Sequence, residues 1–340
     1  MERNAHRLGL SATASPRTRR ASTVTRSKRS SELDQSPRRV ARVVGRRLPR
    51  RVRPMLKAIE RQYLLPVGRR MTAPLRCDPS FVVIGAMKGG TTSLYRYLSE
   101  SPQITMAHVK EVNYFALYPD RSMAWYRSHF PLRITNRSKA SGEASPYYLY
   151  HPYAAERLAQ AYPDSKLMIL LRDPTARAIS HYVAMASADR EPLQLLEAIE
   201  REMSGPGTPE RVIRQGGPEL EQSMHRVNSY VGRGFYAEQL DRWLEYFPRS
   251  AMFIRRSEDL FAEPRPFMHD VTRFLEVEDL PESVQFKIYN PGHELPASRK
   301  DEDLSMAVKR LREIYHEPNI ALFERYAIRW DNISDGERVE

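Results

Sequence analysis

The chain contains a single cysteine, Cys77, among its 340 residues. One thiol excludes an internal disulfide and any metal site built from several cysteines. No stretch approaches the roughly 18 uncharged apolar residues that a transmembrane helix needs. The N-terminus is positively charged but lacks the apolar segment of a secretory signal. These absences favour a soluble protein of a reducing compartment, so we expect a cytoplasmic protein, with peripheral membrane association as the further possibility.

Acidic residues are scarce at the start of the chain. Residues 1–70 carry 20 Lys/Arg and 4 Asp/Glu, a net charge of +16, and the remaining 34 basic and 38 acidic residues give −4. Residues 1–39 have few large apolar side chains and are predicted to be disordered. Residues 40–64 mix arginine with Val, Leu and Ile and could contact an anionic membrane. We expect a basic tail over 1–70 and one folded domain over 75–335.

Two other interpretations of the tail stay open. It could be a solvated arm, or upstream sequence read from a misassigned start, because Met55 and Met71 both precede the folded part. Charge alone would also permit nucleic-acid binding. We expect no nucleic-acid partner, because no module of aromatic and basic residues accompanies the charge.

A glycine loop follows the first apolar run. Residues 81–84 (FVVI) read as a buried strand, residues 85–92 (GAMKGGTT) turn sharply, and a helix begins near Ser93. A strand, a glycine loop and a helix N-terminus together present backbone N–H groups to an anion. Nucleotide-binding loops read GxxxxGK[ST]. Here the glycine spacing fits, but Lys88 lies inside the loop, which predicts phosphate binding unlike that of an ordinary ATPase.

Strand and helix patterns then alternate, which indicates an α/β domain with a mainly parallel sheet. Residues 166–171 (KLMILL) form a second buried strand, and Asp173-Pro174 is typical of a helix start. A shorter strand is predicted at 252–254. Apolar stripes with helical spacing occupy three further segments: 236–247, 267–275 and 304–315.

Arg172 and Ser180 are candidates for a second phosphate contact. A side chain at the carboxyl end of a parallel strand faces the crevice where such sheets bind ligands. A guanidinium and a nearby hydroxyl suit a phosphate. The alternative is that Arg172 pairs with a carboxylate and Ser180 is an exposed helix residue.

Taken together, the motifs at 85–92 and 172–182 (RDPTARAISHY) resemble the sulfotransferases that use 3′-phosphoadenosine 5′-phosphosulfate (PAPS). The resemblance is greatest to the heparan sulfate glucosaminyl branch and its bacterial relatives, and it covers about residues 80–330. It implies a P-loop-like three-layer α/β fold, with flanking helices on a mainly parallel central sheet. Further fragments follow in the family's order: Lys110–Phe115, Gly142–Tyr148, Gly234–Tyr236, Ser257–Leu260 and Tyr315–Asn319.

The resemblance also implies roles for individual residues. The 5′-phosphate would be held by Lys88, Gly89, Gly90, Thr91 and Thr92, and the 3′-phosphate by Arg172 and Ser180. Glu111 aligns with the catalytic base of the family, and its alternative role is a surface salt bridge. The sequence departs from several glycan-specific members at Ala144, where they have lysine. Arg299 and Lys300 lie where the family has a basic loop over the nucleotide.

Four aromatic residues and two histidines complete the list of candidates. Tyr147 and Tyr148 are candidates for stacking on a saccharide, whereas Trp125 and Tyr126 are expected in the core. His108 could reach the molecule that accepts the sulfuryl group, and His181 could pack beside Tyr182.

The sequence predicts sulfuryl transfer from PAPS to a hydroxyl of a carbohydrate, glycolipid or other glycoconjugate. Charge neutralisation by Lys88, Arg172 and helix N-termini would make a metal unnecessary. Asp173 could instead act as a magnesium-binding carboxylate, although an N-cap role is simpler. The alternatives are a nucleoside-triphosphate phosphotransferase (a kinase) and a non-catalytic adaptor. The kinase would require a lysine after the second glycine.

Overall fold

The computed structural model describes residues 65–136, 138–205, 227–289 and 302–330. The chain divides into two units, residues 1–58 and 59–340, and all described residues lie in the second. Most of the expected tail, and residues 290–301 with Arg299 and Lys300, therefore lie outside the described residues. Among the described helices, none is both long and apolar enough to cross a bilayer.

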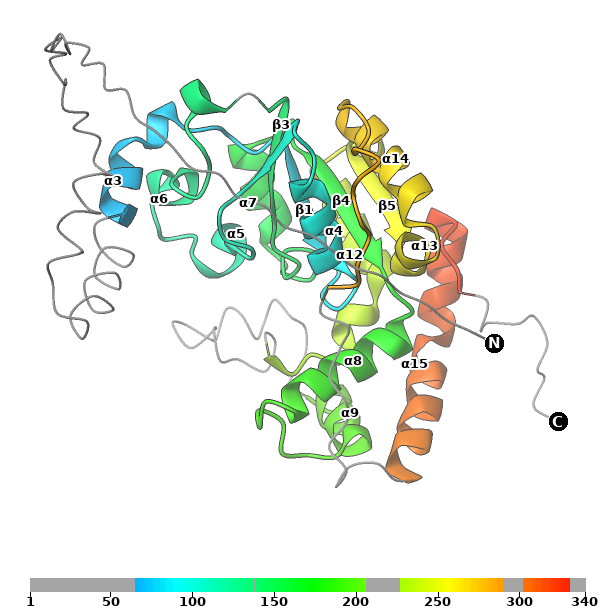
Figure 1. Ribbon diagram of the computed structural model, residues 1–340. Helices are drawn as coiled ribbons and strands as arrows, with labels where there is room; N and C mark the ends of the chain where they lie inside the picture. Colours follow the sequence, from blue (N-terminus) through cyan, green and yellow to red (C-terminus); the bar gives the residue numbers. More distant parts are fainter. Residues whose placement is uncertain (1–64, 137, 206–226, 290–301, 331–340) are drawn as a thin grey trace, which may run out of the picture. The chain divides into compact units, whose positions relative to one another are not determined.

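Five parallel strands form the centre of this unit (Figure 1). Their order is β2-β3-β1-β4-β5, and every pair of neighbours is parallel. Since β1 is the third of the five strands, its carboxyl end lies in the middle of the sheet edge where ligands bind in such folds. The strands are β1 (Phe81–Gly85), β2 (Ile104–Met106), β3 (Ala140–Ala144), β4 (Lys166–Leu171) and β5 (Met252–Arg256).

Alternate residues of the central strands enter two separate cores. Val82 and Ile84 belong to one apolar cluster, and Phe81 and Val83 to the other. This alternation follows from the two-residue period of a strand, and both faces are apolar because helices cover both. The first face is covered by α7 (Ala154–Ala161) and α12 (Tyr236–Leu244), and the second by α4 (Thr91–Ser99), α13 (Ser257–Ala262) and α14 (Pro264–Leu275).

Three further helices share a third apolar cluster. They are α8 (Pro174–Ala186), α9 (Leu195–Met203) and α15 (Glu302–Tyr326). The remaining helical segments are short: α3 (Leu65–Met71), η2 (Ala73–Leu75), α5 (Tyr114–Leu117), α6 (Met123–Arg127), η3 (Arg133–Thr135), η5 (Gly232–Gly234) and η6 (Arg249–Ala251). The expected three-layer α/β fold with a mainly parallel sheet is confirmed.

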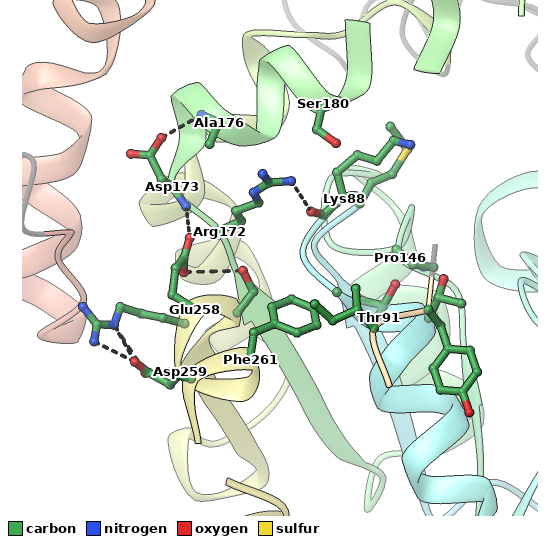
Figure 2. Close-up of a pocket in the computed structure, with 18 of the residues that line it drawn as sticks. Lys88, Thr91, Pro146, Arg172, Asp173, Ala176, Ser180, Glu258, Asp259 and Phe261 are labelled. Atoms are coloured by element: carbon green, nitrogen blue, oxygen red, sulfur yellow. Dashed lines mark hydrogen bonds and ion pairs between the residues drawn. The ribbon is translucent and has the colours of Figure 1, made fainter. Parts of the chain in front are cut away.

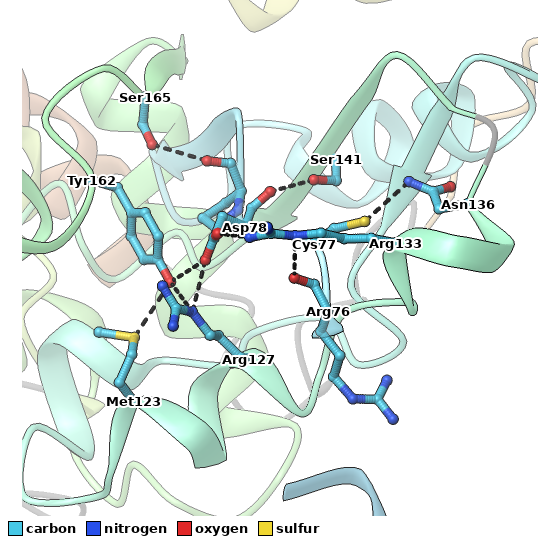
Figure 3. Close-up of polar contacts among 11 residues, drawn as sticks. Arg76, Cys77, Asp78, Met123, Arg127, Arg133, Asn136, Ser141, Tyr162 and Ser165 are labelled. Carbon is cyan, nitrogen blue, oxygen red and sulfur yellow. Dashed lines mark hydrogen bonds and ion pairs between the residues drawn. The ribbon is translucent and has the colours of Figure 1, made fainter. Parts of the chain in front are cut away.

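Polar contacts around Asp78 join the amino ends of the strands (Figure 3). The Asp78 carboxylate accepts hydrogen bonds from Arg127 at 2.7 Å and from the Tyr162 hydroxyl at 3.0 Å, and it also pairs with Arg133. Its carbonyl accepts a hydrogen bond from Ser141 of β3. Asp78 precedes β1 and Tyr162 precedes β4, so these contacts fix three strands at one end of the sheet.

Strands β2 and β3 were not predicted. β3 reads ASGEA and has no apolar run, although all five of its residues are buried. A Cβ placed on Gly142 would meet the ring of Phe81 at 2.4 Å. The glycine of this strand is therefore required by a neighbour on β1, and the strand has no apolar pattern that would predict it.

Candidate functional site

A cavity of about 940 Å³ opens at the carboxyl ends of the strands (Figure 2). It is lined by the loop after β1, by residues 110 and 111, by the turn from β4 into α8, and by α13. The volume is at the upper end of the range for pockets that hold a small molecule or cofactor. Segments far apart in the sequence thus contribute to one site.

The glycine loop packs directly on the end of β4. A Cβ on Gly89 would meet the Leu170 carbonyl oxygen at 2.5 Å, and the Ala86 N–H donates to that oxygen at 2.8 Å. Gly90 has φ +82° and precedes α4 as its N-cap residue, with no side-chain cap. Glycine is required at both positions, by close approach at Gly89 and by backbone conformation at Gly90. The start of α4, at Thr91, consequently faces the cavity.

Lys88 and Arg172 bring two cations together in this cavity. The Arg172 guanidinium donates to the Lys88 carbonyl at 3.5 Å, and both side chains line the cavity. Burial lowers the pKa of Lys88, and the nearby Arg172 lowers it further. Because neighbouring like charges repel, an anion between them would be bound favourably.

The turn from β4 into α8 places Arg172 and Ser180. Asp173 caps α8 by accepting a hydrogen bond from the Ala176 N–H at 2.7 Å, and Pro174 occupies the first helical position. The N-cap interpretation of Asp173 is thereby confirmed. Figure 2 shows the Arg172 and Ser180 side chains reaching toward the loop that carries Lys88. Arg172 and Ser180, the candidates for the second phosphate contact, therefore share one cavity with the glycine loop, which is the candidate for the first.

Glu111 lies at the same cavity in a left-handed conformation. Its φ is +65°, its side chain is 52% exposed, and its carboxylate pairs with Lys110 at 2.8 Å. Both residues line the cavity. The salt bridge of the alternative interpretation exists, but it lies inside the candidate site rather than on a remote surface.

His108 and His181 do not line this cavity. The Nδ1 of His108 lies 2.8 Å from the His129 carbonyl, and its ring stacks on that of His129. His181 is buried and packs edge-on against Tyr230, with ring centroids 4.7 Å apart. Neither histidine is therefore placed like a catalytic base in this structure.

The proposed stacking role of Tyr147 and Tyr148 is wrong. Both are buried, and the Tyr148 hydroxyl donates to Glu143 inside the protein. Tyr126 is likewise buried and Trp125 packs against the same core, as expected. Aromatic packing in the core accounts for all four residues.

The contribution of α13 to the site is not evident from the sequence. Glu258 accepts a hydrogen bond from the Asp173 N–H at 3.1 Å and another from the Trp330 indole at 3.0 Å. Phe261 packs against the glycine loop, since a Cβ on Gly90 would meet its ring at 3.0 Å. The only signal was the family-like fragment at 257–260. Glu258 thus lines the cavity and also fixes the turn that carries Arg172.

Within the described ranges, no group of three or more His, Cys, Asp or Glu side chains is placed to hold a metal ion. The cavity instead combines four basic residues with four acidic ones. They are Lys88, Lys110, Arg172 and Arg256, and Glu111, Asp173, Glu258 and Asp259.

A family model described as the sulfotransferase domain matches residues 78–291. The chain belongs to the sulfotransferase family. The match contains every site candidate named above except Arg299 and Lys300, and the resemblance inferred from the motifs is confirmed.

Several sulfotransferases are similar to the chain. It is 28% identical over 268 residues to the membrane-associated sulfotransferase kil1 of Dictyostelium discoideum, covering 60% of this chain and 57% of that protein. It is 31% identical over 201 residues to human heparan sulfate glucosamine 3-O-sulfotransferase 6, covering 58% and 52%. The chain thus spans about half the length of the curated relatives it matches.

A solved structure shows the same fold. The crystal structure of a sulfotransferase from Alicyclobacillus acidocaldarius superposes with a TM-score of 0.57 at 26% identity, covering 75% of this chain and 98% of that one. The similarity extends along almost the whole bacterial sulfotransferase.

Proposed function

We propose that this sulfotransferase transfers the sulfuryl group of PAPS to a hydroxyl of a carbohydrate or glycoconjugate. One observation carries the proposal: Lys88 and the Arg172–Ser180 pair lie on a single cavity at the ends of β1 and β4. The loop of residues 88–92 would hold the 5′-phosphate at the bridging oxygen. Arg172 and Ser180 would hold the 3′-phosphate, which distinguishes this donor from ATP.

The reaction can be written from the residues at the cavity. The acceptor oxygen attacks sulfur in line with the bond to the 5′-phosphate, that bond breaks, and the hydroxyl proton passes to Glu111. Negative charge grows on the leaving phosphate, where Lys88 and the N-terminus of α4 stabilise it. Adenosine 3′,5′-bisphosphate (PAP) then leaves, and no metal is required to balance this charge.

A carbohydrate acceptor is supported by the relatives whose names include heparan sulfate. β3 ends at Ala144, which is buried and uncharged, so the strand contributes no cation where glycan-specific members have lysine. Lys110 lies in the cavity beside Glu111, the proposed base, and so is a cation on the proposed acceptor side. We infer that the acceptor contains anionic groups which Lys110 contacts.

The geometry supports a kinase less well. A phosphotransferase would need a carboxylate free to hold magnesium after the second buried strand. Asp173 occupies that position but caps α8 and approaches the Glu258 carboxylate through its own N–H. A sulfuryl donor, which needs no magnesium, agrees better with these contacts.

We further propose that a basic segment of residues 1–70 precedes the catalytic domain of 75–335 and contacts anionic membranes or glycans. We propose a cytoplasmic enzyme, which contact with an anionic membrane would hold at the membrane surface. The net charge of +16 supports the attraction, which should weaken as salt rises. Arg69 of α3 donates to the Ser128 carbonyl at 2.6 Å, so the last residues of this range pack on the domain.

PAP should raise the melting temperature strongly without divalent metal, and AMP or ATP much less. A ligand that binds only the folded state stabilises it by RT ln(1 + [L]/Kd), which thermal denaturation measures. Arg172→Met should abolish the preference for PAP over AMP. Arg255→Met is a suitable control, because Arg255 pairs with Asp270 away from the cavity. A larger rise in melting temperature with ATP and magnesium than with PAP would instead favour the kinase.

A further inference from the structure

The loop that carries Glu111 has an unusual backbone. Glu111 has φ +65° and Asn113 has φ +53°, a region that residues other than glycine rarely adopt. Such conformations persist when the surrounding structure holds them in place. The Glu111 N–H donates to the Ala144 carbonyl at the end of β3, at 2.8 Å. The position of Glu111 thus depends on hydrogen-bond acceptors in β3 and in the turn after it.

Two hydroxyl groups hold the next amides of the loop. The Asn113 N–H donates to Ser145 Oγ at 3.0 Å, and the Phe115 N–H donates to the Tyr148 hydroxyl at 3.3 Å. Both hydroxyls donate in turn to Glu143, Ser145 to Oε2 at 2.6 Å and Tyr148 to Oε1 at 3.0 Å. A hydroxyl whose proton is directed at a carboxylate presents its lone pairs elsewhere, here to the amides. Glu143 therefore orients both hydroxyls.

Two more donors reach the same carboxylate. The Tyr126 hydroxyl donates to Oε1 at 3.0 Å, and the Val112 backbone N–H also donates to Glu143. Glu143 is fully buried, so its environment supplies four donors and no solvent. An ionised carboxylate accepts about four hydrogen bonds and donates none. The site is thus matched to the charged form of Glu143.

Burial nevertheless opposes that charge. It raises the pKa of Glu143 to about 7, against the hydrogen bonds, which lower it. The titratable groups facing Glu143 are Tyr126 of α6 and Tyr148 of the turn after β3. Burial raises the pKa of both phenols well above the ordinary value, so both remain neutral donors.

We propose that Glu143 is a positioning residue, whose carboxylate orients Ser145 and Tyr148 so that they hold the loop and keep Glu111 directed at the acceptor hydroxyl. The inference rests on the proposed function, in which Glu111 is the base. Uptake of a proton by Glu143 brings a fifth donor into a site matched to four. Ser145 then loses the acceptor for its own proton, and its hold on the Asn113 amide weakens.

Glu143→Gln tests this directly, because the amide keeps the shape but adds two N–H donors. Hydrogen exchange at the Asn113 and Phe115 amides should accelerate by about tenfold or more. With partly desulfated heparin as acceptor, kcat should fall about 10–100-fold, since a misplacement of about 1 Å can cost on the order of 10². KM for PAPS should stay within about twofold. Unchanged exchange and unchanged kcat would overturn the proposal.

Tyr126→Phe provides a readout that a purely structural role would not move. It removes one donor from Glu143 and leaves Ser145 and Tyr148 in place. Fewer hydrogen bonds to the charged form raise the pKa of Glu143 further. The acidic limb of the kcat profile, expected near pH 7 in the unmodified enzyme, should shift to higher pH with a plateau within about twofold. Tyr162→Phe is the matched control, since that hydroxyl donates to Asp78 instead.

The outcomes separate this inference from the proposed function. If PAP fails to stabilise the unmodified protein, the proposed function fails, and hydrogen exchange still decides whether Glu143 holds the loop. If PAP stabilises it and the exchange is unchanged in Glu143→Gln, the positioning role alone is wrong. If Glu143→Gln does not fold, the kcat profile of Tyr126→Phe decides the question. An acidic limb at the same pH as in the unmodified enzyme rejects the positioning role, and a limb shifted to higher pH supports it.

Discussion

Replacing Glu111 with glutamine should lower kcat by about 10²–10⁴ while leaving PAP binding unchanged. Glutamine keeps the length and the hydrogen-bonding reach of glutamate but cannot accept the proton of the acceptor hydroxyl, and a positioned general base contributes about this factor. The cavity supports the assignment, because Glu111 lies on it together with Lys88. Steady-state kinetics with labelled PAPS, alongside PAP-dependent melting, would measure both effects.

His108→Ala is the control for this substitution. His108 lies three residues upstream, and its Nδ1 is close to the His129 carbonyl outside the cavity. Its removal should change kcat little. Loss of transfer in His108→Ala, with a nearly silent Glu111→Gln, would move the base to the histidine and contradict the family-derived role.

Lys88→Ala should lower kcat by about 10²–10³ without unfolding the protein. The lysine faces the bridging oxygen of the donor in the proposed complex, and removing one preorganised stabiliser of developing charge typically costs this much. Its side chain is not required to hold the loop, which packs on Leu170 through Gly89 and Ala86. The melting temperature without ligand should therefore change little.

The charge argument is tested by comparing Lys88→Ala with Lys110→Ala. Both remove a cation from the same cavity, but Lys110 pairs with Glu111 on the acceptor side. Lys110→Ala should act mainly on the KM of an anionic acceptor, whereas Lys88→Ala should act on kcat at saturating donor. Near-normal turnover of Lys88→Ala at saturating PAPS would refute its role.

Much of the fold could be predicted because its central strands are apolar on both faces. The apolar runs that begin at residues 81, 166 and 252 form β1, β4 and β5, and α8 begins at Asp173-Pro174 as predicted. The polar strand β3 could not be predicted, because Gly142 makes room for a ring that belongs to another strand. A pattern within one segment does not contain that information.

The candidate site divides in the same way. Lys88, Arg172 and Ser180 belong to local motifs, and the structure places them on one cavity. Glu258 acts through Asp173, which is 85 residues away in the sequence. Glu143 acts through the buried hydroxyls of Tyr126 and Ser145. Tyr147 and Tyr148 show the reverse error, because a motif next to proline resembled an exposed platform but is enclosed by its surroundings.

The buried carboxylate of Glu143 also links folding to proton concentration. Its pKa is about 7 in the folded protein and near the ordinary 4.5 in the unfolded chain, so the folded state binds this proton more tightly. The resulting stabilisation is complete below pH 4.5 and is lost as the pH rises through 7. The difference is on the order of 3 kcal/mol, a large share of the roughly 5–15 kcal/mol that separates folded from unfolded domains. The enzyme would then be most active under conditions in which this residue no longer contributes to its stability.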